Sequence, residues 1–403
     1  YYPVQTVRTE LASKEEKQKY AVISSNLDIK GKMQLNKILK NGRLLDNRSE
    51  DKSTVLDNLY QIATTPRAEG LDTKVVLKET INTISNPFVI NQKFGDIPKE
   101  YEAAILNYAQ PNPEAHGDAI NKDTINVENS SSCVSASIEF NLAQLSPAEF
   151  ARFAQGLTSP NVSVQKTIDL KNLTDKTLDS IWLLNNFKIP YELKGDKAVV
   201  TLAPDKNAII RARIQNSHKD NGERSLIDAL MQSTFMNIGS QQSYDALTDT
   251  RGGKFSVDNK GLIEFEKTFT ESIVQNKNKT SIIYQEIDSD TNRLSGYNNN
   301  YKNIENHIDE TLKSGENVIV GIIFTDENKQ ILGGHEITVT GIKVDKNGDK
   351  YYICNDTDDG MPYPVPMKAS ILLPMVHHAG LPQNVVQNDI VAQDSWREGQ
   401  IGR

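Results

Sequence analysis

One of the two cysteines of the chain, Cys133, lies where a short polar segment, residues 130–132, meets a run of small and apolar residues. Apolar side chains recur there at helical spacing, which predicts a buried helix from Asn129 to about Leu142 with Cys133 in its first turn. The unpaired N–H groups and the positive dipole end of a helix N-terminus stabilise a thiolate. The same N–H groups can donate to the oxyanion of an acyl-transfer intermediate. Cys133 is therefore the candidate nucleophile.

A histidine far downstream supplies the base that such a thiol requires. His335 follows two glycines and lies in an apolar, β-branched segment, residues 331–344. A second strand-like segment, residues 351–355, ends in Asn355 and is followed by Asp356. An imidazole beside the thiol takes up its proton, and a third group holds the ring in the required tautomer. We predict Asn355 as this third group, with Asp356 as the alternative.

The pairing of these two strands limits which residue can reach the imidazole. Alternation along a strand places Asn355 and Asp356 on opposite faces, so only one of them can orient His335. A symmetric hairpin sets Asn355 opposite a residue near Thr340, so a bulge or an offset between the strands is required. The other cysteine, Cys354, lies within the apolar strand and is predicted to be a buried, unreactive residue.

Helical patterns fill the first quarter of the chain, and strand patterns fill much of the last. Residues 1–109 are predicted to be a helical N-terminal region, which a segment rich in Pro, Asn and Gly, residues 110–122, links to the rest. Residues 191–202 predict a β-hairpin, and residues 318–355 predict a meander of antiparallel strands. Helices followed by a sheet indicate an α+β fold. Residues 381–403 are rich in Gln, Asn and Asp and are predicted to be a flexible C-terminal tail.

Three of these segments resemble the papain-like cysteine peptidases. Their counterparts in that family are the cysteine helix, the histidine strand and the strand that ends in Asn, which here are residues 130–138, 333–341 and 351–355. A further stretch, residues 226–247, resembles the calpain branch. The resemblance implies a two-lobed papain-like fold over residues 110–380, with Cys133 on a helical lobe and His335 on an antiparallel β lobe.

The resemblance also implies an activity, which is the hydrolysis of peptide bonds in a protein or peptide substrate by a cysteine endopeptidase. A Cys-His-Asn/Asp triad performs that reaction without a metal or another cofactor. The oxyanion glutamine that the family carries six residues before the cysteine is replaced here by Val127. The nearby amides of Asn126 and Asn129 are therefore the candidate side-chain oxyanion donors. The longer span from the cysteine to the histidine implies an insertion.

Two other classes of function stay open. A catalytically inactive papain-like binding module would account for the missing glutamine and for the altered residues after Asn355. An acyl-transfer enzyme, such as a deamidase or a transglutaminase-like transferase, would use the same three groups. Residues 1–109 have about the length of a pro-region, so self-inhibition followed by cleavage is one interpretation of this segment, and an accessory domain is the other.

Composition and charge limit the partners. With 403 residues, of which 37% are hydrophobic, the chain can form a substantial core. The net charge of -8 is spread along the sequence without a cluster of Lys and Arg, so no nucleic-acid partner is expected. No apolar run approaches the roughly 18 residues that span a membrane, so no membrane span is expected. Two cysteines do not distinguish the cytosol from a secreted context, and the oligomeric state also stays open.

A pair of adjacent histidines, His377 and His378, resembles a metal-binding pair only in composition. Neighbours on an extended segment point to opposite sides, and no cluster of cysteines or carboxylates accompanies them in the sequence. The sequence therefore predicts a surface or tail position for the pair and no metal site.

Overall fold

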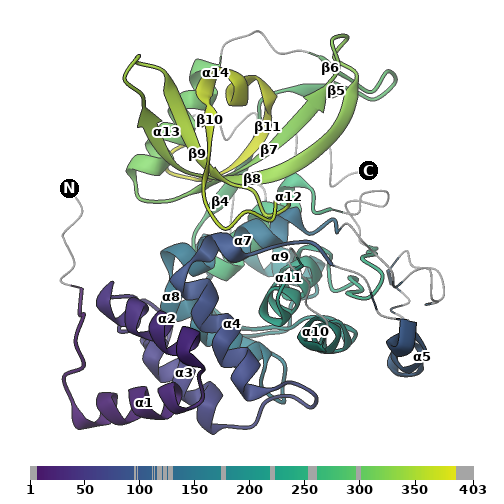
Figure 1. The fold of residues 1–403 in the computed structure, drawn as a ribbon. Helices are drawn as coiled ribbons and strands as arrows, with labels where there is room; N and C mark the ends of the chain where they lie inside the picture. Colours follow the sequence, from purple (N-terminus) through teal and green to yellow (C-terminus); the bar gives the residue numbers. More distant parts are fainter. Residues whose placement is uncertain are drawn as a thin grey trace.

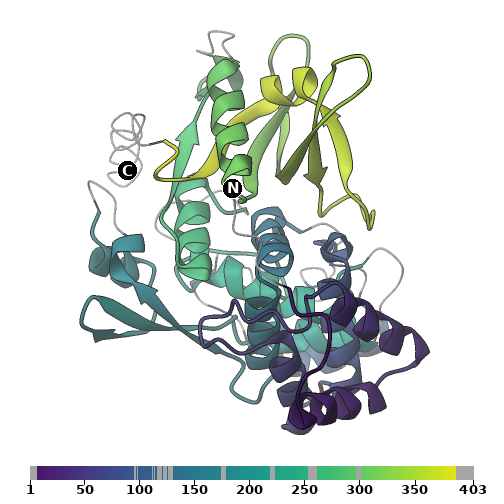
Figure 2. The ribbon, with the colours of Figure 1, turned by 90° about the vertical axis from the view of Figure 1, so that its left-hand side faces the viewer.

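The computed structural model describes residues 7–94, 97, 99–110, 112, 114–115, 120, 125, 130–173, 178–217, 223–252, 261–295 and 301–386. Figure 1 shows most helices gathered in one part of the molecule and a twisted sheet in the other. We call them the helical part and the sheet part. Figure 2 shows the same division after a turn of 90°.

The helices of the described residues are α1 (Lys14–Ser25), α2 (Ile29–Lys40), α3 (Val55–Thr64), α4 (Thr73–Ser85), α5 (Lys99–Tyr108), α7 (Cys133–Leu145), α8 (Pro147–Leu157), α9 (Ser180–Asn186), α10 (Ala208–Ser217), α11 (Leu226–Gly239), α12 (Glu264–Gln275), α13 (Lys302–Lys313) and α14 (Ala369–Leu372). Short 3-10 turns lie at Pro87–Val89, Leu170–Asn172 and Leu373–Met375. The strands are β1 (Val164–Asp169), β2 (Tyr191–Lys194), β3 (Lys197–Leu202), β4 (Lys279–Ile283), β5 (Glu286–Asp288), β6 (Arg293–Ser295), β7 (Val318–Thr325), β8 (Ile331–Val344), β9 (Lys350–Asn355), β10 (Val365–Lys368) and β11 (Val376–Pro382).

Side chains at the first turn explain where several helices begin. Before α3, the Thr54 hydroxyl accepts from the N–H of Asp57, and the Asp57 carboxylate accepts from the N–H of Thr54. Ser225 and Asp228 form the same capping box before α11. Each box provides partners for two N–H groups, one in the first helical turn and one at the N-cap residue itself, and so fixes the residue at which the helix starts.

One hydrophobic cluster holds the helical part together. It joins the N-terminal helices to the cysteine helix α7 and to α11 and α12, through residues that include Ile38, Leu59, Ile138, Phe235 and Phe269. Every residue from Val134 to Ala143 is buried, because other elements pack against α7 on all sides. The N-terminal helices α1 to α4 thus share their core with the helix that carries Cys133.

The sheet part is built on one antiparallel sheet. Among the described residues it has six strands in the order β10-β9-β8-β7-β11-β4. One face forms a second core with α13 and α14, through Ile308, Val320, Ile337 and Leu372 among others. On the other face, Ile319 belongs to the cluster of the helical part. Two smaller sheets, β1-β3-β2 and β5-β6, lie outside this framework, and the first of them extends from one edge in Figure 2.

The α+β class with antiparallel sheets is confirmed. The strand predicted over residues 318–325 is β7, the segment 331–344 is β8, and the hairpin over residues 191–202 is formed by β2 and β3. The predicted C-terminal tail differs, because β11 continues to Pro382. Residues 381–386 include the buried side chains of Leu381 and Val386, which pack in the second core, so these residues belong to the sheet part. Residues 387–403 lie outside the described part of the chain.

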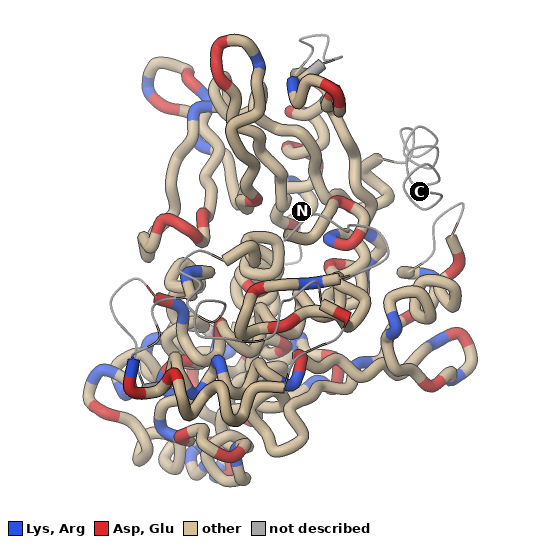
Figure 3. Tube along the Cα trace, turned by 90° about the vertical axis from the view of Figure 1, so that its right-hand side faces the viewer, with Lys and Arg blue, Asp and Glu red and all other residues tan. Residues whose placement is uncertain are grey.

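Charged side chains are distributed over both parts. Figure 3 shows basic and acidic residues interleaved along the described chain, in agreement with the dispersed charge of the sequence. Among the helices that the structure describes, none is long and apolar enough to cross a membrane.

The shared core predicts that the N-terminal helices unfold together with the rest. Ile38 in α2 is fully buried, whereas Ile29 at the start of the same helix is 80% exposed. We expect Ile38→Ala to lower the free energy of unfolding by about 2–5 kcal/mol and to shift a single transition in urea, followed by circular dichroism. Ile29→Ala is the matched control and should change the free energy of unfolding by less than about 0.5 kcal/mol. A separate early transition, with the main one unmoved, would show an independent N-terminal unit.

Candidate active site

Cys133 lies in the first turn of α7, as predicted, and is the first residue of the helix, which begins four residues later than the predicted start at Asn129. The preceding residue, Ser132, makes no capping hydrogen bond with its side chain. The N–H groups of the first turn have no carbonyl partner within a helix and point out of its N-terminus. They are therefore available beside the thiol to a developing negative charge.

The residues before Cys133 are held by hydrogen bonds to other segments. The hydroxyl of Ser132 donates to the side-chain oxygen of Gln232 in α11 at 3.2 Å. The hydroxyl of Ser130 donates to the backbone oxygen of Gln92 at 2.6 Å. Ser132 is thus bonded away from the helix N-terminus, which explains why it does not cap α7. The polar segment that looked like a simple helix start is an anchored loop.

Ser131 is bonded to a buried acid that the sequence analysis did not single out. Its N–H and its hydroxyl both donate to Oδ2 of Asp249, at 2.7 and 2.6 Å. The hydroxyl of Tyr244 donates to the other carboxylate oxygen at 2.8 Å. Burial raises the pKa of Asp249, and these three hydrogen bonds oppose that effect. Asp249 lies two residues after the stretch 226–247, so the segment that follows this stretch contacts the loop before Cys133.

His335 lies on β8 opposite Ile322, and its side chain is 15% exposed. Its Nε2 is 2.7 Å from Oδ1 of Asp356, and the ring also lies close enough to Cys133 for the sulfur to influence the pKa of the imidazole. Because Nε2 faces the carboxylate, Nδ1 is the nitrogen left for the sulfur. The structure therefore brings Cys133, His335 and Asp356 together from three separate segments.

Electrostatics favour a charged imidazole at this position. Burial by itself would lower the pKa of His335, but the bond to Asp356 and the influence of Cys133, with the negative charges of both groups, together outweigh it and raise the pKa to about 10. Burial opposes ionisation of Asp356 as well, yet the bond to His335, the charge of that ring and the N–H of Asp358 together keep the pKa of the carboxyl below its usual value. At neutral pH the ring is therefore an imidazolium between two acidic groups.

A bulge decides which residue orients the ring. Gly341 of β8 pairs with Ile353 of β9, but the next residue of β9, Cys354, pairs with Val339. Thr340 is therefore an extra residue of β8 without a partner in the pairing. Asn355 then lies opposite Thr338. Continued by one residue, the register sets Asp356 opposite Ile337, on the face of His335. The structure thus brings Asp356, the alternative, to His335 and places Asn355 on the opposite face, where it is buried.

The side-chain amides predicted for the oxyanion, Asn126 and Asn129, lie outside the described residues. Gln92 was missed, because it precedes the cysteine by far more than six residues. It donates its N–H to the backbone oxygen of Thr357 at 3.0 Å and accepts from the Thr357 hydroxyl at 2.7 Å. Its side-chain nitrogen lies 3.5 Å from the oxygen of Ser130, a weak contact, and among the described residues this nitrogen has no shorter hydrogen bond.

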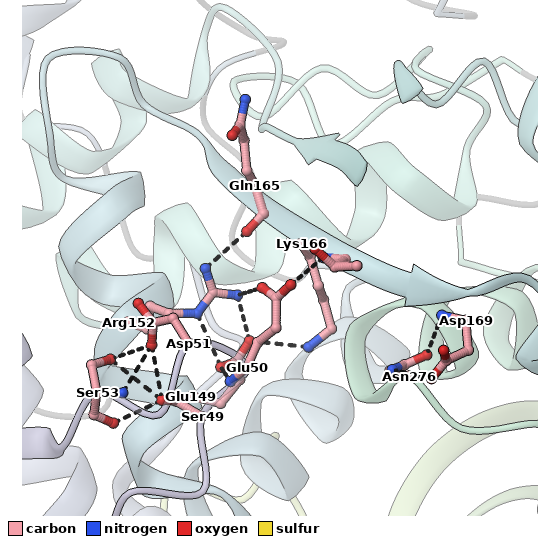
Figure 4. Close-up of polar contacts among 11 residues, drawn as sticks. Ser49, Glu50, Asp51, Ser53, Glu149, Arg152, Gln165, Lys166, Asp169 and Asn276 are labelled. Carbon is pink, nitrogen blue, oxygen red and sulfur yellow. Dashed lines mark hydrogen bonds and ion pairs between the residues drawn. The ribbon is translucent and has the colours of Figure 1, made fainter. Parts of the chain in front are cut away.

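A cavity of about 210 Å³ lies elsewhere in the molecule. It is lined by residues near the C-terminal end of α7, which is roughly 12–18 Å along the helix axis from Cys133. Figure 4 shows the ion pairs at this place, in which Glu149 bonds Arg152 at 2.6 Å and Lys166 at 3.0 Å. Glu50 also pairs with Arg152, at 3.1 Å, so two carboxylates balance two cations here and these four groups are held in ion pairs.

The adjacent histidines are not at the surface, in contrast to the prediction. His377 is the extra residue of a second bulge, between Val376 and His378 of β11, and it is buried. The bulge cancels the alternation on which the prediction rested, so the two rings lie with their Nδ1 atoms 3.0 Å apart. Glu264 lies beside both rings, and the three form a group that could hold a metal ion.

Comparisons of the chain with protein-family models, with curated proteins and with solved structures find no match. The residues of the site and their geometry therefore carry the functional argument by themselves.

The role of Asp356 can be tested through the titration of His335. Asp356→Asn removes the negative charge that favours the imidazolium, so we expect the pKa of His335 to fall from about 10 by at least one unit. The imidazolium would then be lost at lower pH, as seen by NMR of histidine-labelled protein. Asp358→Asn, the same change two residues away, should leave this titration in place. An unchanged His335 titration in Asp356→Asn would remove Asp356 from the site.

Proposed function

We propose that this protein is a papain-like cysteine peptidase that hydrolyses peptide bonds through Cys133, His335 and Asp356. The observation that carries the proposal is the 2.7 Å bond of His335 Nε2 to Asp356, in a ring whose pKa Cys133 at the first turn of α7 also influences. A thiol, an imidazole and a fixed orienting group in this order are the requirements of nucleophilic acyl transfer. The helical part that carries Cys133 and the antiparallel sheet that carries His335 support a two-lobed papain-like fold.

The reaction follows from the positions of these groups. The Cys133 thiolate attacks the carbonyl carbon of the substrate, and the first-turn N–H groups of α7 stabilise the oxyanion that forms. His335 donates its Nδ1 proton to the leaving amine as the C–N bond breaks, which leaves a thioester on the sulfur. His335 then takes a proton from water, which attacks the thioester and releases the carboxylic acid. Asp356 keeps the ring oriented through both steps.

Gln92 is the side-chain amide that we propose for the oxyanion in place of Asn126 and Asn129. It joins the loop before Cys133 to the residue after Asp356, so it lies between the nucleophile and the orienting group. Its weakly bonded Nε2 has donor capacity left for a substrate oxygen. The same hydrogen bonds also make Gln92 a link between the helical part and the sheet part.

The shared core of α1 to α4 and α7 favours an N-terminal region that is an integral part of the fold. A pro-region would more often pack on a finished catalytic domain than complete its core. The pro-region nevertheless remains a prediction, and truncation near Gln110 tests it, because a removable inhibitor leaves an active enzyme whereas loss of a core leaves an unfolded one.

Cleavage of a peptide mixture tests the activity, with products identified by mass spectrometry under reducing conditions. We expect Cys133→Ala to lower kcat/KM by at least about 10³-fold and an epoxide thiol inhibitor to stop the wild type. Cys354→Ala is the control and should stay active, because Cys354 is buried and burial raises the pKa of its thiol to about 12.

The other outcomes of that experiment separate the alternatives. Release of ammonia from glutamine peptides without chain cleavage would indicate a deamidase or a transferase. No turnover, together with a Cys133 that is no more reactive toward iodoacetamide than Cys354, would contradict the enzyme and favour a binding module.

The role of Gln92 has a separate test. Gln92→Glu keeps an oxygen that can accept from Thr357 but removes the N–H donor. We expect it to lower kcat by about 10²–10³-fold with little change in KM, as measured for the loss of an oxyanion donor elsewhere. A change confined to thermal stability, with kcat preserved, would reduce Gln92 to a structural link.

A further inference from the structure

A second group of polar side chains lies where α12 meets the sheet, apart from the three residues of the proposed active site. It consists of Glu264 at the start of α12 and the two adjacent histidines, His377 and His378, of β11. The side chains are 17%, 9% and 12% exposed in that order, so the group is largely shielded from solvent but not sealed.

The three side chains present their donor atoms as a small triangle. Nδ1 of His377 and Nδ1 of His378 are 3.0 Å apart. Oε1 of Glu264 is 3.7 Å from the first of these atoms and 3.6 Å from the second. Four ligands placed tetrahedrally at about 2.0–2.1 Å from a zinc ion are about 3.3–3.4 Å from one another. The mean side of the triangle therefore equals the edge of a tetrahedral zinc site, and the fourth corner is left for water or another ligand.

A second carboxylate fixes the ring of His378 in the tautomer that a metal requires. Nε2 of His378 is 2.6 Å from Oε1 of Glu336, whose other oxygen accepts from Lys267 at 3.2 Å. A carboxylate only accepts hydrogen bonds, so Nε2 carries the proton and Nδ1 directs its lone pair at the triangle. A histidine that binds a metal through one ring nitrogen usually donates the N–H of its other ring nitrogen to a carboxylate, which holds the ring in place.

The backbone provides the space for this arrangement at two positions. His377 is the bulged residue of β11, which lets both neighbouring rings face Glu264. Gly321 on β7 is paired with both His378 and Glu336, and a Cβ there would lie 1.9 Å from the His378 ring. Any other residue at position 321 would force the His378 ring or the backbone beside it to move.

We propose that Glu264, His377 and His378 bind a divalent transition-metal ion, with zinc as the preferred ion, and that Glu336 supports the site. Two imidazole nitrogens and one carboxylate oxygen are a ligand set that zinc takes and that magnesium or calcium does not favour. The ion would join α12 of the helical part to β11 of the sheet part and so stabilise their docking. The proposal stands independently of the proposed peptidase activity.

The test measures zinc binding by calorimetry in the full chain carrying Cys133→Ala, because a thiol beside His335 could itself bind zinc. We expect one zinc ion per chain, and at least tenfold weaker binding when Glu264→Gln or His377→Gln is added. Glu316→Gln and His307→Gln are the matched controls, since Glu316 has the same 17% exposure and His307 is as buried as His377. Both should bind zinc as the parent does.

X-ray absorption of the zinc-loaded parent keeps the test decisive if a variant fails to fold. Two imidazole nitrogens and one carboxylate oxygen at about 2.0–2.1 Å would support the site. Absence of zinc binding, equal binding of magnesium, a sulfur ligand, or full affinity in both Glu264→Gln and His377→Gln would overturn it and leave a hydrogen-bonded network only.

Discussion

The register of β8 is the constraint on which both sites depend. Consecutive residues of a strand point to opposite faces, so His335 meets Cys133 while its neighbour Glu336 meets α12 and β11. The bulge at Thr340 then places Asp356 on the face of His335. A shift of β8 by one residue would exchange its two faces and remove both arrangements together. The proposed catalytic and metal groups are therefore linked by one feature of the backbone.

The contact between the helical part and the sheet part is polar as well as apolar. Lys267 of α12 and Glu336 of β8 form a buried ion pair, and the side-chain N–H of Asn317, just before β7, donates to the side-chain oxygen of Asn141 in α7 at 2.9 Å. Breaking a buried pair by removing one partner costs about 3–5 kcal/mol, because the other charge is left without compensation. Polar groups of this kind restrict the two parts to one relative position. That restriction is what an active site assembled from both parts requires.

The proposed active site contains charged groups whose ionisation is disfavoured by burial. Burial disfavours the charged form of His335 and of Asp356. For His335 it is outweighed by Asp356 and Cys133 together, and for Asp356 by His335 together with the N–H of Asp358. The backbone N–H of Asp358 also donates to the Asp356 carboxylate at 3.0 Å, which holds its position. On the other side, Cys133 lies at the N-terminus of α7. The charged form of His335 is thus held between the Asp356 carboxylate and this helix N-terminus.

The sequence by itself indicated many of the helices, the strands β2, β3 and β7 to β9, and the candidate groups Cys133 and His335, because periodicity and sequence context are local properties. It could not choose between Asn355 and Asp356, since that choice depends on a bulge which shifts the pairing of two strands. The sequence also predicted that His377 and His378 point to opposite sides. That prediction was wrong, because residues alternate only along a regular strand and β11 has a bulge at His377. Gln92 and Glu264 were invisible for another reason: each is brought to its site from a distant segment by packing. Only the tertiary structure decided these positions, because register and long-range contacts are properties of paired elements and not of any one segment.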